Sequence, residues 1–345
     1  MKIEPSINKI ELKQKIEDEY GLTVKSFKFV PKGEFASSYV IMTESKEKFF
    51  LKLYFSSRLK ELKIKHLDFS TKMAYQLYDK FGIKQISCPL KTLEGKLKIR
   101  FQRAEMVLWN FIEGKIVSEK KSRTNLFAEK LAELLARIHN TTSKFEIKQE
   151  YRFNFKLEFK DDLLTSLREI DARTSSTDKT FLKLKKLITP QMNDILQALK
   201  YLEELTEKLR NENSHSYVVC HTDPIRHNII TDKQGEIYLI DWDGATLAPF
   251  EQDIWFYINA KNSHSFIKKY KEIREINKVD EDIIIYLFYE RTLADLTDWI
   301  YRILFEESSS VQLKNDFEGL KEDVIPVLPK MKEIENSLKK RAKKW

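Results

Sequence analysis

A short strand–turn–strand segment lies between two long helical stretches, and it constrains the fold more than any other feature of the sequence. It covers residues 217–243, YVVCHTDPIRHNIITDKQGEIYLIDWD, where short apolar runs are separated by residues typical of turns. Most of residues 115–210 and 250–340 has helical spacing instead, and the apolar stripe within residues 127–138 is the clearest example. The sequence therefore predicts a helical part that is interrupted by one small hairpin.

The first 110 residues carry the other strand patterns. A helical run that begins at Ile7 stops at Gly21, and a second helical run closes at Gly82. Between and after them we expect strands at residues 22–30, 37–43 and 48–55, a long helix at about 58–81, and two further strand-like runs that end near residue 111. We therefore expect a β-rich N-terminal lobe over residues 1–110 and a helical C-terminal lobe over residues 111–345.

Composition excludes several classes of protein. The chain has 345 residues, 42% of them hydrophobic, and its net charge of +8 comes mainly from lysines interleaved with glutamates. That interleaving is typical of solvated helix faces, so we expect no nucleic-acid partner. The longest apolar run, residues 283–289, is too short to cross a bilayer, and the N-terminus has no signal-peptide pattern. With two cysteines, Cys88 and Cys220, we expect a cytoplasmic protein without disulfides or membrane contact, either a monomer or a homodimer.

The hairpin contains the residue types that phosphoryl transfer requires. Asp223 and Asn228 lie five residues apart in a loop, and Asp241 ends the strand that follows. One carboxylate can orient and deprotonate the attacking hydroxyl, while a carboxylate and an amide oxygen can hold Mg²⁺ on the phosphates. Asp and Asn also form ordinary turns, and a lone Asp-x4-Asn pattern would be weak. The preceding His221 and the aspartate at the end of the apolar strand make the signal specific.

The two segments HTDPIRHN and YLIDWDGATLAPFEQDIWF resemble the aminoglycoside phosphotransferase family. This resemblance implies a bilobal, protein-kinase-like α+β fold, with a small antiparallel sheet and one long helix in the N-terminal lobe and a mainly helical C-terminal lobe. It also implies transfer of a phosphoryl group from ATP or GTP, with Mg²⁺, to a hydroxyl. By matching position, Asp223 would be the catalytic base, Asn228 and Asp241 the Mg²⁺ ligands, and His221 a brace for the loop.

A kinase-like chain needs a lysine on its third strand to hold the nucleotide phosphates. In KFFLKLYF, residues 48–55, alternation leaves Phe50, Lys52 and Tyr54 on one face, and a lysine within such an apolar strand requires a partner. Lys52 is therefore expected to bind the nucleotide. Asp68 is one candidate for its helical carboxylate partner and Glu61 is the other, and a surface role for either is equally compatible with the sequence.

Two further segments are expected to contact the nucleotide. The turn that begins at Gly33 has one glycine only, but Ser37 and Ser38 could face phosphate there. The segment EMVLWNFIEG fits the connector between the lobes, where the base would pair with the backbone near Asn110 and Phe111. A plain core strand is compatible with the same segment.

The acceptor is predicted from a wider resemblance, to the spectinomycin phosphotransferase branch of the family, which includes the connector and the YERTLADL segment. It implies a hydroxyl on spectinomycin or a related aminocyclitol; relatives that act on choline, homoserine, methylthioribose or macrolides are the alternatives. A cationic acceptor would need carboxylates, and the candidates are Asp243, Glu290 and Asp295. An i, i+4 surface pair between Arg291 and Asp295 is the competing interpretation.

Overall fold

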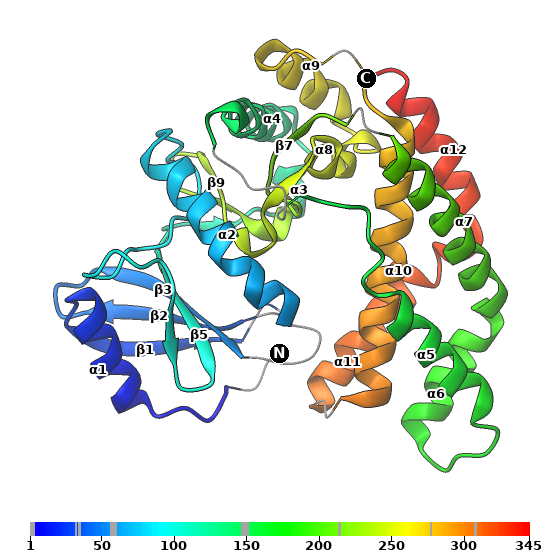
Figure 1. Cartoon of the computed structure of the whole chain (residues 1–345), viewed down its shortest axis with the longest axis horizontal. Coiled ribbons are helices and arrows are strands. Elements are labelled where there is room, and N and C mark those ends of the chain that lie inside the picture. The colour runs from blue at the N-terminus through cyan, green and yellow to red at the C-terminus, as the bar shows by residue number, and fades with distance from the viewer. Residues whose placement is uncertain are drawn as a thin grey trace. The chain divides into compact units, whose positions relative to one another are not determined.

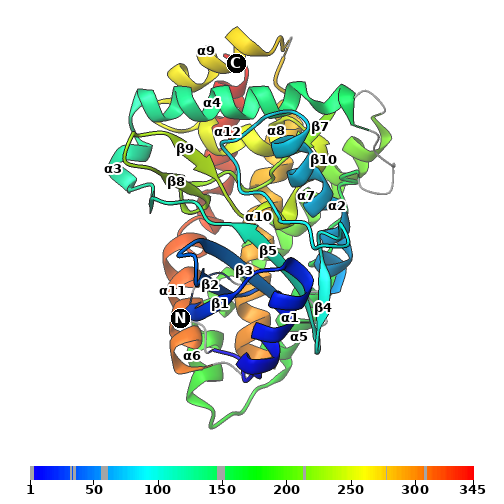
Figure 2. The same cartoon turned by 90° about the vertical axis from the view of Figure 1, so that its left-hand side faces the viewer.

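The computed structural model describes residues 4–31, 33, 36–55, 61–145, 152–212, 215–276, 278–306 and 309–345, with the side chains of residues 61–65 left out. The chain divides into two compact units, which Figures 1 and 2 show from two directions. The first combines Met1–Arg152 with Tyr217–Glu275, and the second combines Phe153–Ser216 with Ile276–Trp345. The lobe boundary between residues 110 and 111 divides the chain differently and stays a prediction.

A five-stranded antiparallel sheet organises the N-terminal part of the first unit. Its strand order is β1-β2-β3-β5-β4. The strands are β1 (Val24–Val30), β2 (Ser37–Thr43), β3 (Lys48–Phe55), β4 (Ile99–Phe101) and β5 (Ala104–Asn110). The strands expected over residues 22–55 and before residue 111 are therefore confirmed.

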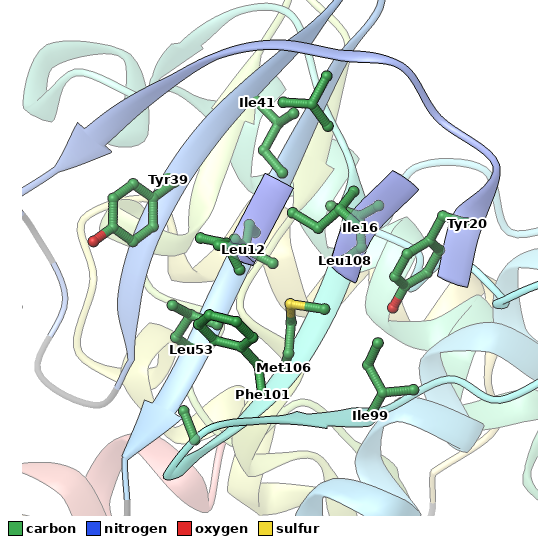
Figure 3. Close-up of a cluster of buried hydrophobic side chains, with 13 residues drawn as sticks. Leu12, Ile16, Tyr20, Tyr39, Ile41, Leu53, Ile99, Phe101, Met106 and Leu108 are labelled. Carbon is green, nitrogen blue, oxygen red and sulfur yellow. The ribbon is translucent and has the colours of Figure 1, made fainter. Parts of the chain in front are cut away.

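One face of this sheet forms a hydrophobic core with helix α1 (Lys9–Tyr20) (Figure 3). Leu12 and Ile16 of α1 are fully buried there, together with Leu51 and Leu53 of β3. The helix begins after Asn8, whose side chain accepts from the N–H groups of residues 10 and 11. It ends at Gly21, which has a left-handed φ of 67°. Since Leu51 and Leu53 take the core, Lys52 and Tyr54 lie on the opposite face, as the alternation predicts.

The hairpin of residues 217–243 is split between two small sheets in the first unit. Strand β7 (Tyr217–Cys220) pairs with β10 (Thr246–Pro249), which the sequence analysis missed. Strand β8 (Ile229–Thr231) pairs with β9 (Ile237–Leu239) and with β6 (Lys115–Ile116). Asp223 and Asn228 therefore lie in the β7–β8 loop, and Asp241 and Asp243 lie in the β9–β10 connection.

Helix α2 (Glu61–Asp79) connects the sheet to the hairpin. It packs against the short helix η6 (Trp242–Gly244), directly after Asp241. The neighbouring chain segment also joins the hairpin, because the N–H of Ser87 donates to the carbonyl of Leu239 at 3.0 Å. The large sheet and the hairpin are thus held together within one unit.

The remaining helices of the first unit support the hairpin. They are α3 (Glu119–Ser122), α4 (Asn125–Asn140), α8 (Glu251–Ile258) and α9 (Ser263–Ile273). The apolar stripe predicted within residues 127–138 lies in α4, whose buried side packs against α9 and β7.

The second unit is helical throughout its regular structure in the described residues. Its elements are α5 (Lys160–Ala172), α6 (Lys179–Ile188), α7 (Met192–Asn211), α10 (Glu281–Phe305), α11 (Ser310–Gly319), the π-helical turn Leu320–Val324 and α12 (Met331–Ala342). Helix α10 packs against α5, α7, α11 and α12 (Figure 1). None of the helices in the described part of the chain combines the length and hydropathy that a membrane crossing requires.

Candidate active site

Asp223 and Asn228 lie together in the loop of residues 221–228, which joins β7 to β8. The Asn228 side-chain amide donates to the Asp223 carboxylate Oδ2 at 2.8 Å and to the Asp223 carbonyl at 2.9 Å. Both N–H bonds of that amide are therefore used inside the loop, and they fix one carboxylate oxygen of Asp223. The buried hydroxyl of Tyr257 further restrains the loop by donating to the carbonyl of Pro224 at 2.6 Å.

The fully buried carboxylate of Asp253 anchors the start of this loop. Asp253 is the third residue of α8, and it accepts from the backbone N–H of His221 at 2.9 Å and of Thr222 at 2.6 Å. It also accepts from Nε2 of the buried His139 at 3.0 Å. A carboxylate with three donors is well compensated for its burial. The loop backbone is thereby fixed in space relative to α4 and α8.

Thr222 lies in an unusual conformation at the centre of this anchor. Its φ is +76°, in the left-handed region that β-branched residues rarely adopt. The backbone bond to Asp253 and a 3.2 Å bond from the Thr222 hydroxyl to the Gly244 carbonyl retain it there. Left-handed backbone at a β-branched residue costs about 1–3 kcal/mol, which the surrounding contacts must offset.

His221 joins the loop to the strand that ends at Asp241. Its Nε2 donates to the carbonyl of Ile240 at 2.9 Å, so its Nδ1 is left to accept from the N–H of Asp223, at 3.3 Å. The residue is 1% exposed, and its ring packs edge-on against Trp242. These contacts are structural, in agreement with the bracing role that the family resemblance implied.

Lys52 lies at the meeting point of the large sheet and the hairpin. Its ammonium Nζ is 2.5 Å from Oδ1 of Asp241 and 2.9 Å from Oδ2 of Asp243, and only 8% of the residue is exposed. The lysine required on the third strand therefore has two carboxylate partners, both from the hairpin. Asp68, one of the two candidate partners on the long helix, is not one of them.

Charge and burial act against each other in this cluster. Burial alone would lower the pKa of Lys52, but the charges of Asp241 and Asp243 raise it well above its usual range. Burial would raise the pKa of Asp241, yet the adjacent Lys52 ammonium lowers it overall. For Asp243, burial together with the Asp241 charge outweighs Lys52, and its pKa is raised. The ammonium therefore stays charged and Asp241 stays ionised.

Asp243 is held on both oxygens. Besides Lys52 on Oδ2, the Tyr54 hydroxyl donates to Oδ1 at 2.7 Å, and 13% of the Asp243 side chain is exposed. From the sequence, Asp243 is one of the candidates for binding a cationic acceptor. In the structure its carboxylate is occupied by two groups of β3, so its visible task is to orient Lys52.

Asn228 and Asp241 present a donor set that suits Mg²⁺. The two bonds to Asp223 use the amide nitrogen of Asn228, and its carbonyl Oδ1 takes no part in them. Asp241 has a left-handed backbone, with φ at 69°, and its side chain is 41% exposed, far more than those of Lys52 or Asp243. An amide oxygen and an accessible carboxylate are hard ligands of the kind that Mg²⁺ prefers. These residues fit the ion that the sequence predicts.

Several other predicted residues have different surroundings. Asp68 pairs with Lys98 at 3.2 Å rather than with Lys52, so the predicted Lys52–Asp68 pair does not form in this structure; the Glu61 side chain lies outside the described residues. Ser38 is opposite Lys52 in the β2–β3 register and shares its face, whereas Ser37 is opposite the core residue Leu53. Of the two serines, only Ser38 is directed toward the face that carries Lys52.

Asn110 and Phe111 end β5 where the chain leaves the sheet. The N–H of Asn110 donates to the Cys88 carbonyl at 2.9 Å, and its side-chain oxygen accepts from the Cys88 N–H at 2.7 Å. Asn110 is therefore committed to the neighbouring chain segment. The ring of Phe111 lies 5.3 Å from the ammonium of Lys48. Contact of either residue with a nucleotide base stays a prediction.

The two remaining acceptor candidates, Glu290 and Asp295, lie on α10 in the second unit. Asp295 accepts from the guanidinium Nε of Arg291 at 2.8 Å, which is the i, i+4 pair named above as the competing interpretation. Contact of either carboxylate with an acceptor stays a prediction.

Sequence reasoning missed two histidines that support the site. His139 falls on the buried side of α4, four residues after Leu135, and an apolar stripe that includes a histidine was the signal available. His66 of α2 donates from Nε2 to the carbonyl of Ala245 at 2.7 Å. No local pattern marks His66, because its partner is far away in the sequence.

A sheet with a buried lysine on its third strand, joined to a hairpin that carries Asp223, Asn228 and Asp241, defines a protein-kinase-like phosphotransferase. The family model described as phosphotransferase enzyme family matches residues 26–275, more than half of the chain, and the chain belongs to that family. It is an enzyme that transfers a phosphoryl group to a hydroxyl acceptor.

Solved structures share the fold over nearly the whole chain. A spectinomycin phosphotransferase in complex with ADP and spectinomycin has 23% identity and a TM-score of 0.76, over 95% of this chain and 99% of that one. An amicoumacin kinase in complex with AMP-PNP and Ca²⁺ has 16% identity and a TM-score of 0.62, over 92% and 95%. A choline kinase from Cryptosporidium parvum has 14% identity and a TM-score of 0.54, over 96% and 98%. The protein-kinase-like fold is thus confirmed.

Proposed function

We propose that this enzyme transfers the γ-phosphoryl group of ATP or GTP to a hydroxyl of an aminocyclitol antibiotic, spectinomycin above all, and so confers resistance. The observation that carries the chemistry is the orientation of Asp223 by Asn228 in the same hairpin whose Asp241 pairs with the buried Lys52. The acceptor is supported by the likeness to a spectinomycin phosphotransferase, which extends over 95% of the chain. We propose a cytoplasmic location, where the triphosphate is present and the free thiols of Cys88 and Cys220 persist.

In this proposal Asp223 accepts the proton of the attacking hydroxyl. Asn228 donates to Oδ2 of Asp223 and so orients the carboxylate that takes this proton. Anchoring by Asp253 keeps the loop in place, so the carboxylate does not have to be ordered during the reaction. Orientation of this kind, with general-base assistance, contributes about 10²–10⁴-fold to the rate of a proton transfer.

Asn228 Oδ1 and Asp241 would hold Mg²⁺, which supplies positive charge to the phosphate oxygens as the bond to the leaving group breaks. Lys52 contacts the nucleotide phosphates, and Asp243, which also binds Tyr54, holds its ammonium on the face of β3 opposite the hydrophobic core. Ser38, on the same face of the sheet, offers a hydroxyl to the phosphates. The base of the nucleotide would bind near Phe111.

Product identification by mass tests the proposal directly. The pure enzyme is incubated with Mg²⁺ and ATP, then with GTP, against spectinomycin, other aminoglycosides, choline, homoserine and methylthioribose. We expect spectinomycin to gain the mass of one phosphate, and we expect the Asp223→Asn variant to form this product about 10²–10⁴-fold more slowly. Product on another acceptor alone would overturn the antibiotic assignment while leaving the phosphotransferase chemistry intact.

A metabolite kinase of the same fold is the second candidate. It is favoured by the choline kinase likeness and by an aminopropanol kinase with a TM-score of 0.64 over 94% of this chain. Amino alcohols and aminocyclitols share a cationic nitrogen near a hydroxyl, so a carboxylate-lined acceptor site suits both. Phosphorylated amino alcohol with unchanged spectinomycin, in the assay above, would favour this candidate.

A further inference from the structure

A basic pocket lies on the first unit, between helix α2 and the chain segment of residues 91–98. Its volume is about 500 Å³, and we call it the α2 pocket. The charged side chains of its lining are four lysines, Lys72, Lys91, Lys96 and Lys98, and one carboxylate, Asp68. Leu97 is its single aliphatic side chain. The lining therefore offers strong positive charge and very little apolar surface.

Two of these lysines are already neutralised by neighbours. Lys98 is bound by Asp68 at 3.2 Å and lies 3.7 Å from Glu105, and Lys96 is bound by Glu94 at 2.7 Å. Both Glu94 and Glu105 lie outside the lining.

Lys72 and Lys91 supply the uncompensated charge. Within the described residues neither of them has a carboxylate partner. The ammonium of Lys91 lies 4.2 Å from the centre of the Tyr75 ring, which is also part of the lining. A cation over an aromatic face keeps its charge and its N–H donors, so this contact orients Lys91 without neutralising it.

The pocket and the active site use opposite faces of α2. At about 100° per residue, Asp68, Lys72 and Tyr75 project roughly opposite to His66. The His66 ring binds the Ala245 carbonyl, and α2 packs against η6, which directly follows Asp241. A ligand in the α2 pocket would therefore press on the same helix that positions the Asp241–Ala245 segment.

We propose that the α2 pocket binds a small anion that carries two or more phosphate groups, and that its occupancy alters nucleotide affinity through α2. Lysine ammoniums bind phosphate as compact point charges, and two uncompensated lysines match an anion with at least two charges. An acidic peptide fits less well, because a peptide site needs apolar pockets for anchor side chains and this lining has only Leu97. The effect on nucleotide affinity rests on the proposed function, whereas binding itself does not.

Calorimetric titration with inorganic pyrophosphate, without metal and with a chelator present, tests the binding. The test variant is Lys72→Glu/Lys91→Glu. The matched control is Lys25→Glu/Lys120→Glu, which makes the same charge change at two exposed lysines of β1 and α3. We expect the test variant to lose at least about tenfold in affinity, as two lost charge contacts imply, and the control to match wild type. Equal binding by the two variants, or no binding by wild type, would overturn the proposal.

Citrate in a parallel titration separates phosphate recognition from general attraction of anions. We expect citrate to bind more weakly than pyrophosphate, and equal affinity would overturn the assignment to phosphate.

ADP affinity with and without pyrophosphate then tests the linkage to α2. Pyrophosphate that competes with ADP at the nucleotide site would lower the ADP affinity of every protein alike. We therefore expect a further change in ADP affinity in wild type and in the control variant, and none in the test variant. Pyrophosphate binding without that shift would overturn the linkage, and neither result depends on the identity of the acceptor.

Discussion

Asp243 binds Lys52 and Tyr54 through its two oxygens, at 2.9 and 2.7 Å, and so links two residues on one face of β3 to the hairpin. A lysine on a four-carbon side chain can adopt many conformations, and a phosphate contact requires one of them. The Asp243 carboxylate, which is 13% exposed, restricts that freedom before the nucleotide arrives. We therefore propose that Asp243 is a positioning residue for Lys52.

The variant Asp243→Asn tests this role. The amide keeps the shape of the side chain but removes the charge that faces Lys52. We expect kcat/KM for the nucleotide to fall by about tenfold, equivalent to ~1.4 kcal/mol, mostly through KM, because Asp223 is untouched. Steady-state kinetics at varied nucleotide concentration measure the split. Tyr54→Phe removes one bond to the other oxygen and should have a smaller effect in the same direction. A change confined to the KM of the acceptor would instead support the substrate role.

Asp223→Asn tests the catalytic base. The replacement amide can still accept the bond from Asn228, so the loop should keep its geometry. We expect turnover to fall by about 10²–10⁴-fold with nearly unchanged nucleotide affinity. Asp232→Asn, the same change in the β8–β9 turn of the hairpin, is the control and should keep wild-type turnover. A folded Asp223→Asn enzyme with near-normal turnover would remove Asp223 from the chemistry.

His139 gives the first unit a predictable response to acid. Burial lowers the pKa of this ring from its ordinary 6.5, although the adjacent Asp253 acts in the opposite direction. The neutral ring can donate from Nε2 to Asp253 and accept at Nδ1 from the Tyr270 hydroxyl, at 2.6 Å. Protonation would remove that acceptor and place a second donor against the hydroxyl.

The sign of the pH dependence follows from the lowered pKa. At a pH below about 6.5 the unfolded chain binds a proton that the folded chain excludes, so stability falls as the pH falls. Above that pH His139 is neutral in both states, and its contribution to the free energy of unfolding is fully present. We expect the unfolding free energy of wild type to decline below pH 6.5 more steeply than that of His139→Gln, by up to about 1.4 kcal/mol per pH unit. Denaturant titrations between pH 5 and 7.5 measure both slopes, and equal slopes would contradict this origin.

The parts of the fold that depend on local pattern were predictable from the sequence. Alternation in residues 48–55 assigned Lys52 and Tyr54 to one face of β3, and Gly21 marked the end of the first helix. The hairpin motif brought Asp223 and Asn228 into one loop, since only five residues separate them. In each case the contact is set within one element or one turn.

Contacts between distant segments could not be predicted in the same way. Lys52 is 189 residues from Asp241, and the sequence offered Asp68 and Glu61, both on the following helix, as its candidate partners. In the structure Asp68 instead pairs with Lys98, which directly precedes β4. The strand β10 was missed because its partner β7 lies on the other side of the loop. Tertiary packing decides which distant segments pair, and the spacing of residues along the chain does not show it.

Thr222 and Gly244 provide a last test, of the strained backbone beside Asp223. A Cβ atom on Gly244 would lie 2.8 Å from the Thr222 hydroxyl oxygen, closer than real Cβ contacts allow. Since Thr222 is held by Asp253 in its left-handed conformation, it cannot easily move aside. We expect Gly244→Ala to destabilise the enzyme by about 1–3 kcal/mol, the usual range for overpacking.

The Thr222→Gly change removes the hydroxyl oxygen with which a Cβ atom on residue 244 would clash. Glycine adopts φ near +76° without steric cost, so Thr222→Gly alone relieves strain that offsets the lost bond to the Gly244 carbonyl. We therefore expect the single Thr222→Gly change to be close to neutral, and Thr222→Val, which keeps the strain and loses the bond, to be destabilising. The double variant should recover at least half of the Gly244→Ala loss, a coupling of about 0.5–3 kcal/mol. Denaturant unfolding of wild type, Gly244→Ala, Thr222→Gly and the double variant measures this coupling energy. Strictly additive changes in the free energy of unfolding would show that the two residues do not restrain each other.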